Sequence, residues 1–232
     1  MESRLPEGLT DSRSSRKKLW KHSFFFILIL VLAAALVLTV AGGRGLFRSK
    51  SGNADSVRTT PPAPAPRPPD VALVRPLLKN GDVILRSGIG LWSEQIRAGN
   101  THDKRFSHVG VVSIEPDGSY RVIHAEANDL TGSGEVFFDT LEHFVGESTE
   151  IGIGRLHVSD PDALAEAAKT FIGRPFDWKF NSADDSAIYC TELVDLSLRK
   201  IDPELRLPMV NGVIQTEACL MPEYFTEIPV EQ

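Results

Sequence analysis

The stretch "RFSHVGVV" (residues 105–112) places one histidine, His108, at the start of a short apolar run rich in β-branched residues. Such a run predicts a buried strand. Further along, "AIYCTELV" (187–194) places Cys190 at the start of a helical pattern of apolar residues. A thiol nucleophile needs a general base within hydrogen-bond reach. We therefore expect this strand and this helix to pack together and to bring His108 to Cys190.

The remaining pattern predicts an α+β fold. Runs of β-branched residues predict strands at 81–88, 108–114, 120–127 and 151–158, with a hairpin turn at 115–119. Helices are predicted at 159–173 and 190–200. The first of these is capped by Ser159 or Asp160, opened by Pro161 and closed by Gly173. Strands in the middle with helices after them favour α+β over alternating α/β.

The N-terminal part predicts a membrane anchor. Eighteen consecutive uncharged residues, almost all apolar, run from Phe24 to Ala41, and about twenty such residues span a bilayer. We expect an uncleaved transmembrane signal anchor at 23–43, with a cleaved signal peptide as the alternative. The basic tail at 1–22 then stays in the cytoplasm by the positive-inside rule. The catalytic domain would be periplasmic or extracellular.

A spacer separates this anchor from the globular domain. Six prolines fall within residues 61–69, and proline fixes φ and lacks an N–H, which favours an extended polyproline II conformation. We expect a linker at 44–70 and one globular domain at 71–232.

Charge and composition exclude several function classes. Residues 1–50 carry nine Lys/Arg against three Asp/Glu, and the remainder carries sixteen against twenty-eight. An acidic main domain argues against nucleic acid as a partner. The six histidines show no paired spacing typical of zinc sites. We expect no metal and no organic cofactor, and the sequence leaves the oligomeric state open.

The chemistry centres on Cys190. Many free cysteines are simply small buried hydrophobic residues, but a helix N-terminus stabilises a thiolate and lowers its pKa, and its N–H groups can hold an oxyanion. A base such as His108 needs a third polar group to orient it. His124 and Glu126, two residues apart on one face of the predicted strand, are both candidates. Cys219 lies in no such context.

Five motifs together carry a resemblance. In chain order they are "GDVIL", "FSHVGVV", "VIHAEA", "IGRPFDWKF" and "YCTELV". This order resembles the permuted papain-like cysteine hydrolases of the YiiX/YebB-like, NlpC-related group, in which the cysteine follows the histidine. The likeness covers residues 80–200, and "ACLMPEYF" (218–225) is similar to that group's closing element before a last strand. It implies a sheet packed against a cysteine-bearing helix.

The resemblance implies Cys190 as nucleophile, His108 as base and His124 as the third catalytic residue, with Glu126 as the rival for that place. It implies positioning roles for Tyr189 and Glu192, and it gives "RPFDW" (174–178) a role in shaping the approach to the cysteine. The expected function is a membrane-anchored thiol hydrolase that cleaves an amide bond, with a cell-wall peptide as the favoured substrate. One alternative is an acyltransferase or lipid deacylase that resembles lecithin:retinol acyltransferase and acts on an acylated small molecule. Another is a catalytically inactive binding module.

Overall fold

The structure, a computed structural model, describes residues 67–128, 130–158, 160 and 162–231. The predicted cytoplasmic tail, transmembrane anchor and most of the proline-rich linker lie outside these residues. Within the described part, none of the helices has the length and apolar character needed to cross a bilayer. The anchor therefore stays a prediction.

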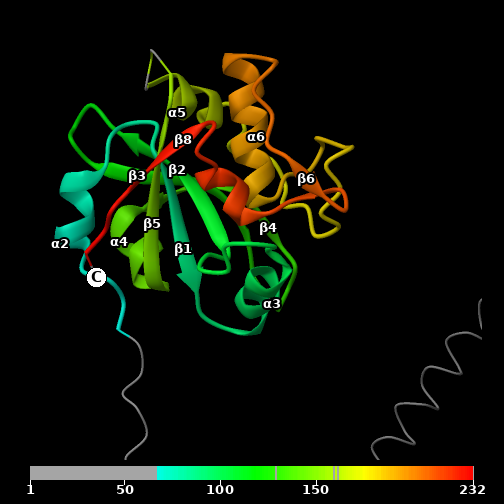
Figure 1. Cartoon of the computed structure of the whole chain (residues 1–232), viewed down its shortest axis with the longest axis horizontal. Helices are drawn as coiled ribbons and strands as arrows, with labels where there is room; N and C mark the ends of the chain where they lie inside the picture. Colours follow the sequence, from blue (N-terminus) through cyan, green and yellow to red (C-terminus); the bar gives the residue numbers. More distant parts are fainter. Residues whose placement is uncertain (1–66, 129, 159, 161, 232) are drawn as a thin grey trace, which may run out of the picture. The chain divides into compact units, whose positions relative to one another are not determined.

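A six-stranded antiparallel sheet forms the centre of the described domain, in the order β4-β3-β2-β1-β5-β8 (Figure 1). The strands are β1 (Val83–Gly88), β2 (His108–Ile114), β3 (Tyr120–Ala127), β4 (Gly134–Thr140), β5 (Ser148–Leu156) and β8 (Phe225–Ile228). A small hairpin pairs β6 (Met209–Val210) with β7 (Val213–Ile214). Because the sheet is antiparallel and is not built from parallel βαβ units, the α+β prediction is confirmed.

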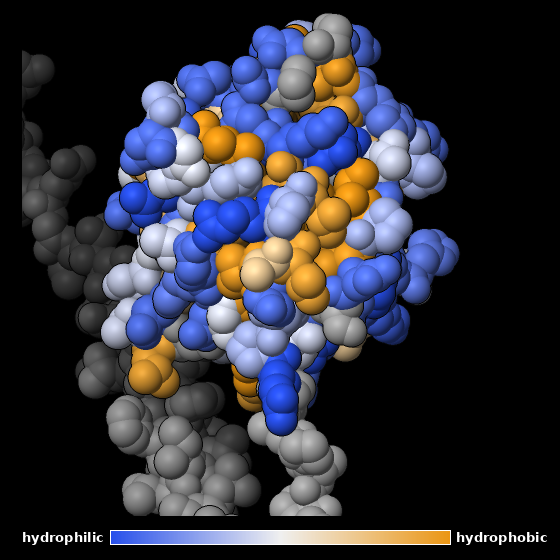
Figure 2. Space-filling model, turned by 90° about the vertical axis from the view of Figure 1, so that its left-hand side faces the viewer, coloured by the Kyte–Doolittle hydropathy of each residue, from blue (hydrophilic) through white to orange (hydrophobic). Residues whose placement is uncertain are grey.

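Helices cover both faces of this sheet. The helices are α2 (Val71–Val74), α3 (Leu91–Gly99), α4 (Leu141–Gly146), α5 (Asp162–Lys169) and α6 (Cys190–Ile201), with short 3-10 turns at Arg75–Leu77 and Thr216–Leu220. On one face, Val109 and Val111 of β2 share a core with α5 and α6. On the other, Val112 shares a core with α2 and α4. Figure 2 shows the face that carries α2, where a group of apolar residues is surrounded by polar ones.

The differences from the predicted elements have physical causes. The predicted helix at 159–173 is shorter, because α5 ends at Lys169 and the chain then turns to Gly173, whose φ of 82° suits glycine. Helix α3 was missed; it is only nine residues long, and none of its residues is buried. Strand β4 was missed too, since its buried positions are few.

Helix α6 begins where the sequence predicted, and a buried carboxyl group caps it. Tyr189 is the N-cap residue, and its backbone N–H donates to Oε2 of Glu192 at 3.3 Å. Glu192 is fully buried. Burial raises the pKa of this carboxyl to about 7, although the N–H of Tyr189 partly opposes the shift. Glu192 therefore titrates near neutral pH, well above an unfolded glutamate.

Replacing Glu192 with glutamine is expected to remove a pH dependence of stability. Because the folded pKa is raised, the native state binds more protons than the unfolded state between about pH 4.5 and 7. The native chain should therefore lose stability as pH rises through that window, by roughly 3 kcal/mol relative to Glu192→Gln. Urea unfolding at pH 5 and pH 8 measures the difference. The matched control is Glu166→Gln, at an exposed position of α5; equal pH slopes for the native chain and Glu192→Gln would contradict the assignment.

Candidate active site

The centre of the site is a pair of histidines on neighbouring strands. Nε2 of His108 on β2 lies 2.8 Å from Nδ1 of His124 on β3. His124 is fully buried, and Phe144 of α4 packs against both rings. A Cβ at Gly110 would lie 2.4 Å from Val122 and 3.1 Å from the Cβ of His124. A glycine is therefore needed at position 110, two residues after His108, so that β2 and β3 can approach closely enough for the two histidines to meet.

A carboxylate lies behind His124. Oδ2 of Asp139, on β4, is 3.6 Å from Nε2 of His124 and 2.7 Å from Nδ1 of His143. Burial alone would raise the pKa of Asp139, but the contacts with His124 and His143 and the N–H of Thr140 outweigh it and lower the pKa to about 2. The hydrogen bond to Asp139 in turn raises the pKa of His143. Asp139 is therefore a carboxylate at neutral pH.

The Asp139 carboxylate determines which ring nitrogen of His124, and in turn of His108, carries a proton. A negative oxygen beside Nε2 of His124 favours the tautomer that carries its proton on Nε2. Nδ1 of His124 then accepts from Nε2–H of His108. Nδ1 of His108 is left without a proton, and it can accept one from a thiol. The 3.6 Å separation exceeds a normal hydrogen bond, so the effect is mainly electrostatic. Sequence reasoning missed Asp139 because β4 was not predicted.

Replacing Asp139 with asparagine is expected to be more harmful than replacing it with alanine. Oδ1 of Asp139 accepts from the N–H of Thr140 at 2.7 Å, so an asparagine would place its NH₂ group toward His124. That group would donate to Nε2 of His124, move the proton to Nδ1 and force His108 into the tautomer that cannot act as base. We expect kcat to fall roughly 100-fold in Asp139→Asn and about tenfold in Asp139→Ala, with KM unchanged. Steady-state kinetics check this, and equal losses in both variants would contradict the tautomer argument.

Cys190 lies at the first turn of α6, which packs against β2 and β3. Its thiol is buried, and the backbone N–H groups of Val109 and Thr191 interact with it. The helix terminus was expected to lower the thiol pKa. Instead, burial raises the pKa of Cys190 to about 11, and the two N–H groups only moderate the rise. The expectation of a lowered pKa was wrong because it ignored desolvation.

His108, the candidate base, is also uncharged at neutral pH. Burial lowers the pKa of His108 well below its ordinary value, and the charge of Arg86 and the neighbouring His124 add to this. The imidazole of His108 and the thiol of Cys190 are therefore both neutral at rest, and a proton must move if the thiol is to attack. No hydrogen bond between Cys190 and His108 occurs in the described part of the chain. The structure thus brings the thiol to Val109, the neighbour of His108, but does not show the direct contact.

Glu126, the rival third residue, has a different partner. Nη2 of Arg86 on β1 pairs with Oε1 of Glu126, while Oε2 of Glu126 lies 3.8 Å from Nδ1 of His124. The Arg86 side chain is only 7% exposed, whereas that of Glu126 is 32% exposed, so the ion pair is desolvated mainly on its arginine side. The ring of His108 is therefore hydrogen-bonded to His124, the residue that the resemblance implied for the third place. Sequence reasoning missed Arg86, although a charge inside an apolar strand pattern was a signal for it.

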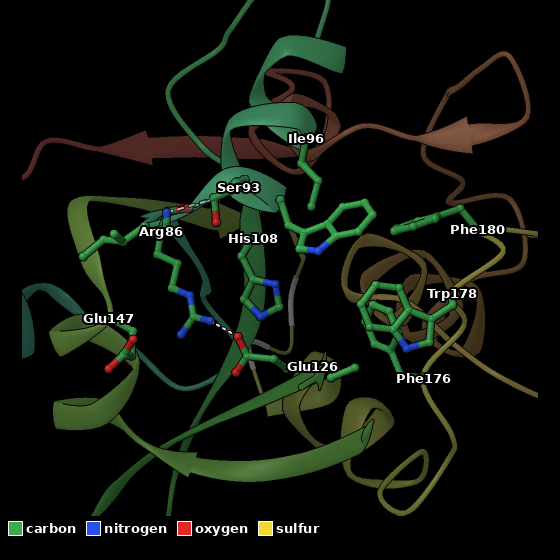
Figure 3. A pocket seen from close by; sticks show the side chains of 14 residues that line it. Arg86, Ser93, Ile96, His108, Glu126, Glu147, Phe176, Trp178 and Phe180 are labelled. Carbon is green, nitrogen blue, oxygen red and sulfur yellow. Dashed lines mark hydrogen bonds and ion pairs between the residues drawn. The ribbon is translucent and has the colours of Figure 1, made fainter. Parts of the chain in front are cut away.

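Two pockets open beside these residues. The first, of about 220 Å³, is lined by His108, Arg86, Glu126 and aromatic side chains. In Figure 3 His108 lies between Arg86 and Glu126 on one side and Phe176, Trp178 and Phe180 on the other. The second, of about 530 Å³, includes Cys190 in its lining. Trp92, Ile96 and Phe180 line both pockets.

The segment "RPFDW" (174–178) positions the start of α6. The backbone N–H of Ile188 donates to the carbonyl of Pro175 at 2.8 Å, and that of Asp177 donates to Ile188 at 3.2 Å. The carboxylate of Asp177 accepts from the N–H groups of Lys179 and Asn181. Ile188 lies two residues before Cys190, so the segment fixes the chain that leads into the cysteine.

His108, His124 and Glu126 also form a cluster whose possible ligand atoms all lie within 4.8 Å of one another. A metal ion would compete with two contacts that are already made. The His108–His124 hydrogen bond occupies one nitrogen of each ring, and the guanidinium of Arg86 neutralises Glu126. A second cation beside this buried guanidinium would be repelled. As arranged, the three residues fit a metal ion poorly.

Two YiiX proteins of Escherichia coli are similar to this chain. A curated relative, described as the uncharacterized protein YiiX of Escherichia coli (strain K12), is 26% identical over 166 residues, which cover 66% of this chain and 77% of that protein. The crystal structure of the metalloprotein YiiX from Escherichia coli O157:H7 matches with a TM-score of 0.54 at 19% identity. It covers 67% of this chain and 98% of that chain. At that identity the second match shows the fold alone.

The family comparison is more specific. The family described as "Permuted papain-like amidase enzyme, YaeF/YiiX, C92 family" matches residues 77–209. This range holds His108, His124 and Cys190 in the order that the motifs indicated, so the resemblance is confirmed. The match spans more than half of the sequence, and the chain belongs to the C92 family of permuted papain-like amidases.

Proposed function

We propose that this protein is a cysteine amidase in which Cys190 is the nucleophile, His108 the general base and His124 the group that orients it. The observation that supports this most directly is the placement of Cys190. Its thiol lies at the N-terminus of α6, beside the strand whose first residue is His108, in a chain of an amidase family. His108 donates to His124, and its other nitrogen makes no hydrogen bond within the described residues.

The proposed reaction has two steps. In the first, His108 takes the thiol proton as Sγ of Cys190 attacks the amide carbonyl carbon. His108 then gives that proton to the leaving nitrogen as the C–N bond breaks, which leaves a thioester on Cys190. In the second, water loses a proton to His108 and attacks the thioester, the C–S bond breaks, and the proton returns to sulfur. The N–H of Thr191 in the first turn of α6, which interacts with the resting thiol, would stabilise the developing oxyanion.

The site of action proposed is the cell envelope. The apolar run at 24–41 and its basic flank would anchor the chain, and the prolines at 61–69 would hold the domain clear of the bilayer. An amide in a cell-wall peptide is the first candidate substrate, because the domain would face that layer. Acyl amides are the second candidate, and the pocket beside Cys190 favours them.

The metal of the YiiX structure from Escherichia coli O157:H7 is not carried over to this reaction. That protein is described as a metalloprotein, whereas Arg86 makes the histidine cluster of this chain a poor cation site. The proposed steps need only a thiol, an imidazole and water. Activity should therefore survive treatment with a chelator.

Hydrolysis assays on muropeptides and on N-acyl amides test the proposal. Release of free amine by the native chain, its loss in Cys190→Ala and its persistence in EDTA are the expected results. Hydrolysis that survives Cys190→Ala but stops in EDTA would replace the thiol mechanism with a metal-dependent one. Binding of either compound with no hydrolysis by the native chain would show a binding module instead.

A further inference from the structure

The most exposed large apolar side chains of the described domain lie at one end of the sheet. They are Leu130, which is 95% exposed, Leu91, at 67%, and Ile89, at 63%. Ile89 and Leu91 follow β1, and Leu130 lies in the turn that follows β3. Because β1 and β3 both pair antiparallel with β2, their C-terminal ends lie at the same end of the sheet, where β2 begins with His108.

Contacts between side chains join these two loops into one surface. The ring of Trp92, in α3, meets that of Trp178 edge-on, with centroids 5.9 Å apart. Nε1 of Trp178 in turn donates to the carbonyl of Gly132, in the turn after β3. The side chain of Trp92 is itself 46% exposed. A group of exposed apolar side chains of this kind marks an interaction site, and we call this group the loop-end surface: Ile89, Leu91, Trp92 and Leu130.

The charges around α3 balance, whereas the domain as a whole is acidic. Lys104 and Lys179 are exposed cations beside this helix, and Glu94 and Glu147 are exposed anions in or beside it. Residues 51–232 carry sixteen Lys/Arg against twenty-eight Asp/Glu. A bilayer that contains anionic lipids repels an acidic protein surface. At α3, however, the domain can approach such a bilayer with little electrostatic repulsion.

The sequence and the course of the chain indicate a bilayer as the occupant of this surface. The uncharged apolar run at 24–41 would hold the chain at a membrane. Residues 42–66 join that run to the described domain and can span at most roughly 85 Å. Such a tether raises the effective concentration of bilayer at the domain, so a small apolar surface suffices for docking. The cyan start of the described chain and α3 both lie at the lower edge of the domain in Figure 1, so the tether enters at the end that carries the loop-end surface.

We propose that the loop-end surface docks on the lipid bilayer to which the predicted anchor would attach the chain. Leu91 and Leu130 insert among the lipid head groups, and the indole of Trp92 lies at the interface, the level that tryptophan prefers. This goes beyond the proposed reaction and does not depend on it. Trp92 also lines the pocket of His108, so docking would turn that side of the site toward the bilayer.

The fluorescence of Trp92 in nanodiscs tests the proposal. The full chain is placed in nanodiscs of phosphatidylcholine and phosphatidylglycerol whose acyl chains either do or do not carry bromine, which quenches indole on contact. Trp20→Phe and Trp178→Phe leave Trp92 as the only tryptophan. Because an interfacial side chain reaches the boundary of the acyl chains, brominated discs should reduce the fluorescence by about half.

Three leucine variants of this single-tryptophan chain localise the contact. Leu91→Asp and Leu130→Asp, combined in one chain, should recover most of the lost fluorescence, because a carboxylate resists insertion. Leu73→Asp is the matched control and should leave the quenching unchanged. Leu73 is 53% exposed on α2, and Arg75, two residues later, lies over Tyr120 at the opposite end of the sheet. Because all three leucines are exposed, each variant should keep its thermal midpoint within about 2 °C.

Every other result would overturn the docking surface. Undiminished fluorescence of Trp92 in brominated discs would do so, as would quenching that persists in the chain with Leu91→Asp and Leu130→Asp. A chain that is recovered without discs has no bilayer to dock on. A dimer that these two substitutions dissociate, with no quenching in discs, would assign the surface to a second copy of this chain. None of these results bears on the proposed amidase, which is tested separately by release of amine.

Discussion

Replacing Cys190 with alanine is expected to abolish amide hydrolysis, with kcat falling roughly 10⁴-fold or more. The thiol is the atom on which the proposed thioester forms, and alanine offers no substitute nucleophile. The fold should survive, because Cys190 contributes only one small side chain to the core around α6. Steady-state hydrolysis of an N-acyl amide measures the loss, and circular dichroism confirms that the variant is folded.

Cys219 provides the control for this variant. It is the second free cysteine and is completely buried within the 3-10 turn Thr216–Leu220, and burial raises its pKa well above the ordinary value. Cys219→Ala should therefore keep kcat within about twofold. A Cys190→Ala enzyme that retained a tenth of the native rate would end the claim that Cys190 is the nucleophile.

Replacing His108 with alanine is expected to lower kcat by about 10³-fold, since a positioned base contributes 10²- to 10⁴-fold. The pH profile tests the electrostatics. His108 must be neutral to accept the proton, and burial together with Arg86 holds its pKa well below the ordinary value. The active form therefore persists as pH falls, and kcat/KM of the native enzyme should stay level from pH 8 to pH 6. An acidic limb centred near 6.5 would contradict this environment.

The same burial predicts how the thiol titrates. With a pKa of about 11, Cys190 should react with iodoacetamide at a rate that still rises above pH 9, and His108→Ala should leave that profile in place. This differs from a preformed thiolate–imidazolium pair, in which removal of the imidazole would raise the apparent pKa. The N-terminus of α6 favours the thiolate of Cys190, but burial has the larger effect and raises the pKa of the thiol.

The sequence predicted those parts of the fold that local pattern determines. The β-branched runs gave β1, β2, β3 and β5 close to their observed bounds, and the apolar spacing after Cys190 gave α6. Helix α3 was not predicted from the sequence, and none of its residues is buried, yet its Trp92 and Ile96 line both pockets. Its place over the site depends on tertiary packing that one sequence does not display.

For the site, the motif order predicted which residues come together but not their protonation. His124 was expected as the partner of His108, and the two rings are hydrogen-bonded. Asp139 and Arg86, which set the tautomer and the charge around that pair, belong to no motif and were not foreseen. The sign of the shift in the Cys190 pKa was also missed, because the depth of burial is a property of the whole fold.

The most direct test of the account is to trap the acyl group on Cys190. The native chain is mixed with a large excess of an N-octanoyl amide, quenched in acid within milliseconds, digested and measured by mass spectrometry. The account predicts an octanoyl adduct on the peptide that carries Cys190, present in Cys219→Ala, absent in Cys190→Ala and formed much more slowly in His108→Ala. Hydrolysis of that amide with no adduct on Cys190, at quench times shorter than one turnover, would contradict it.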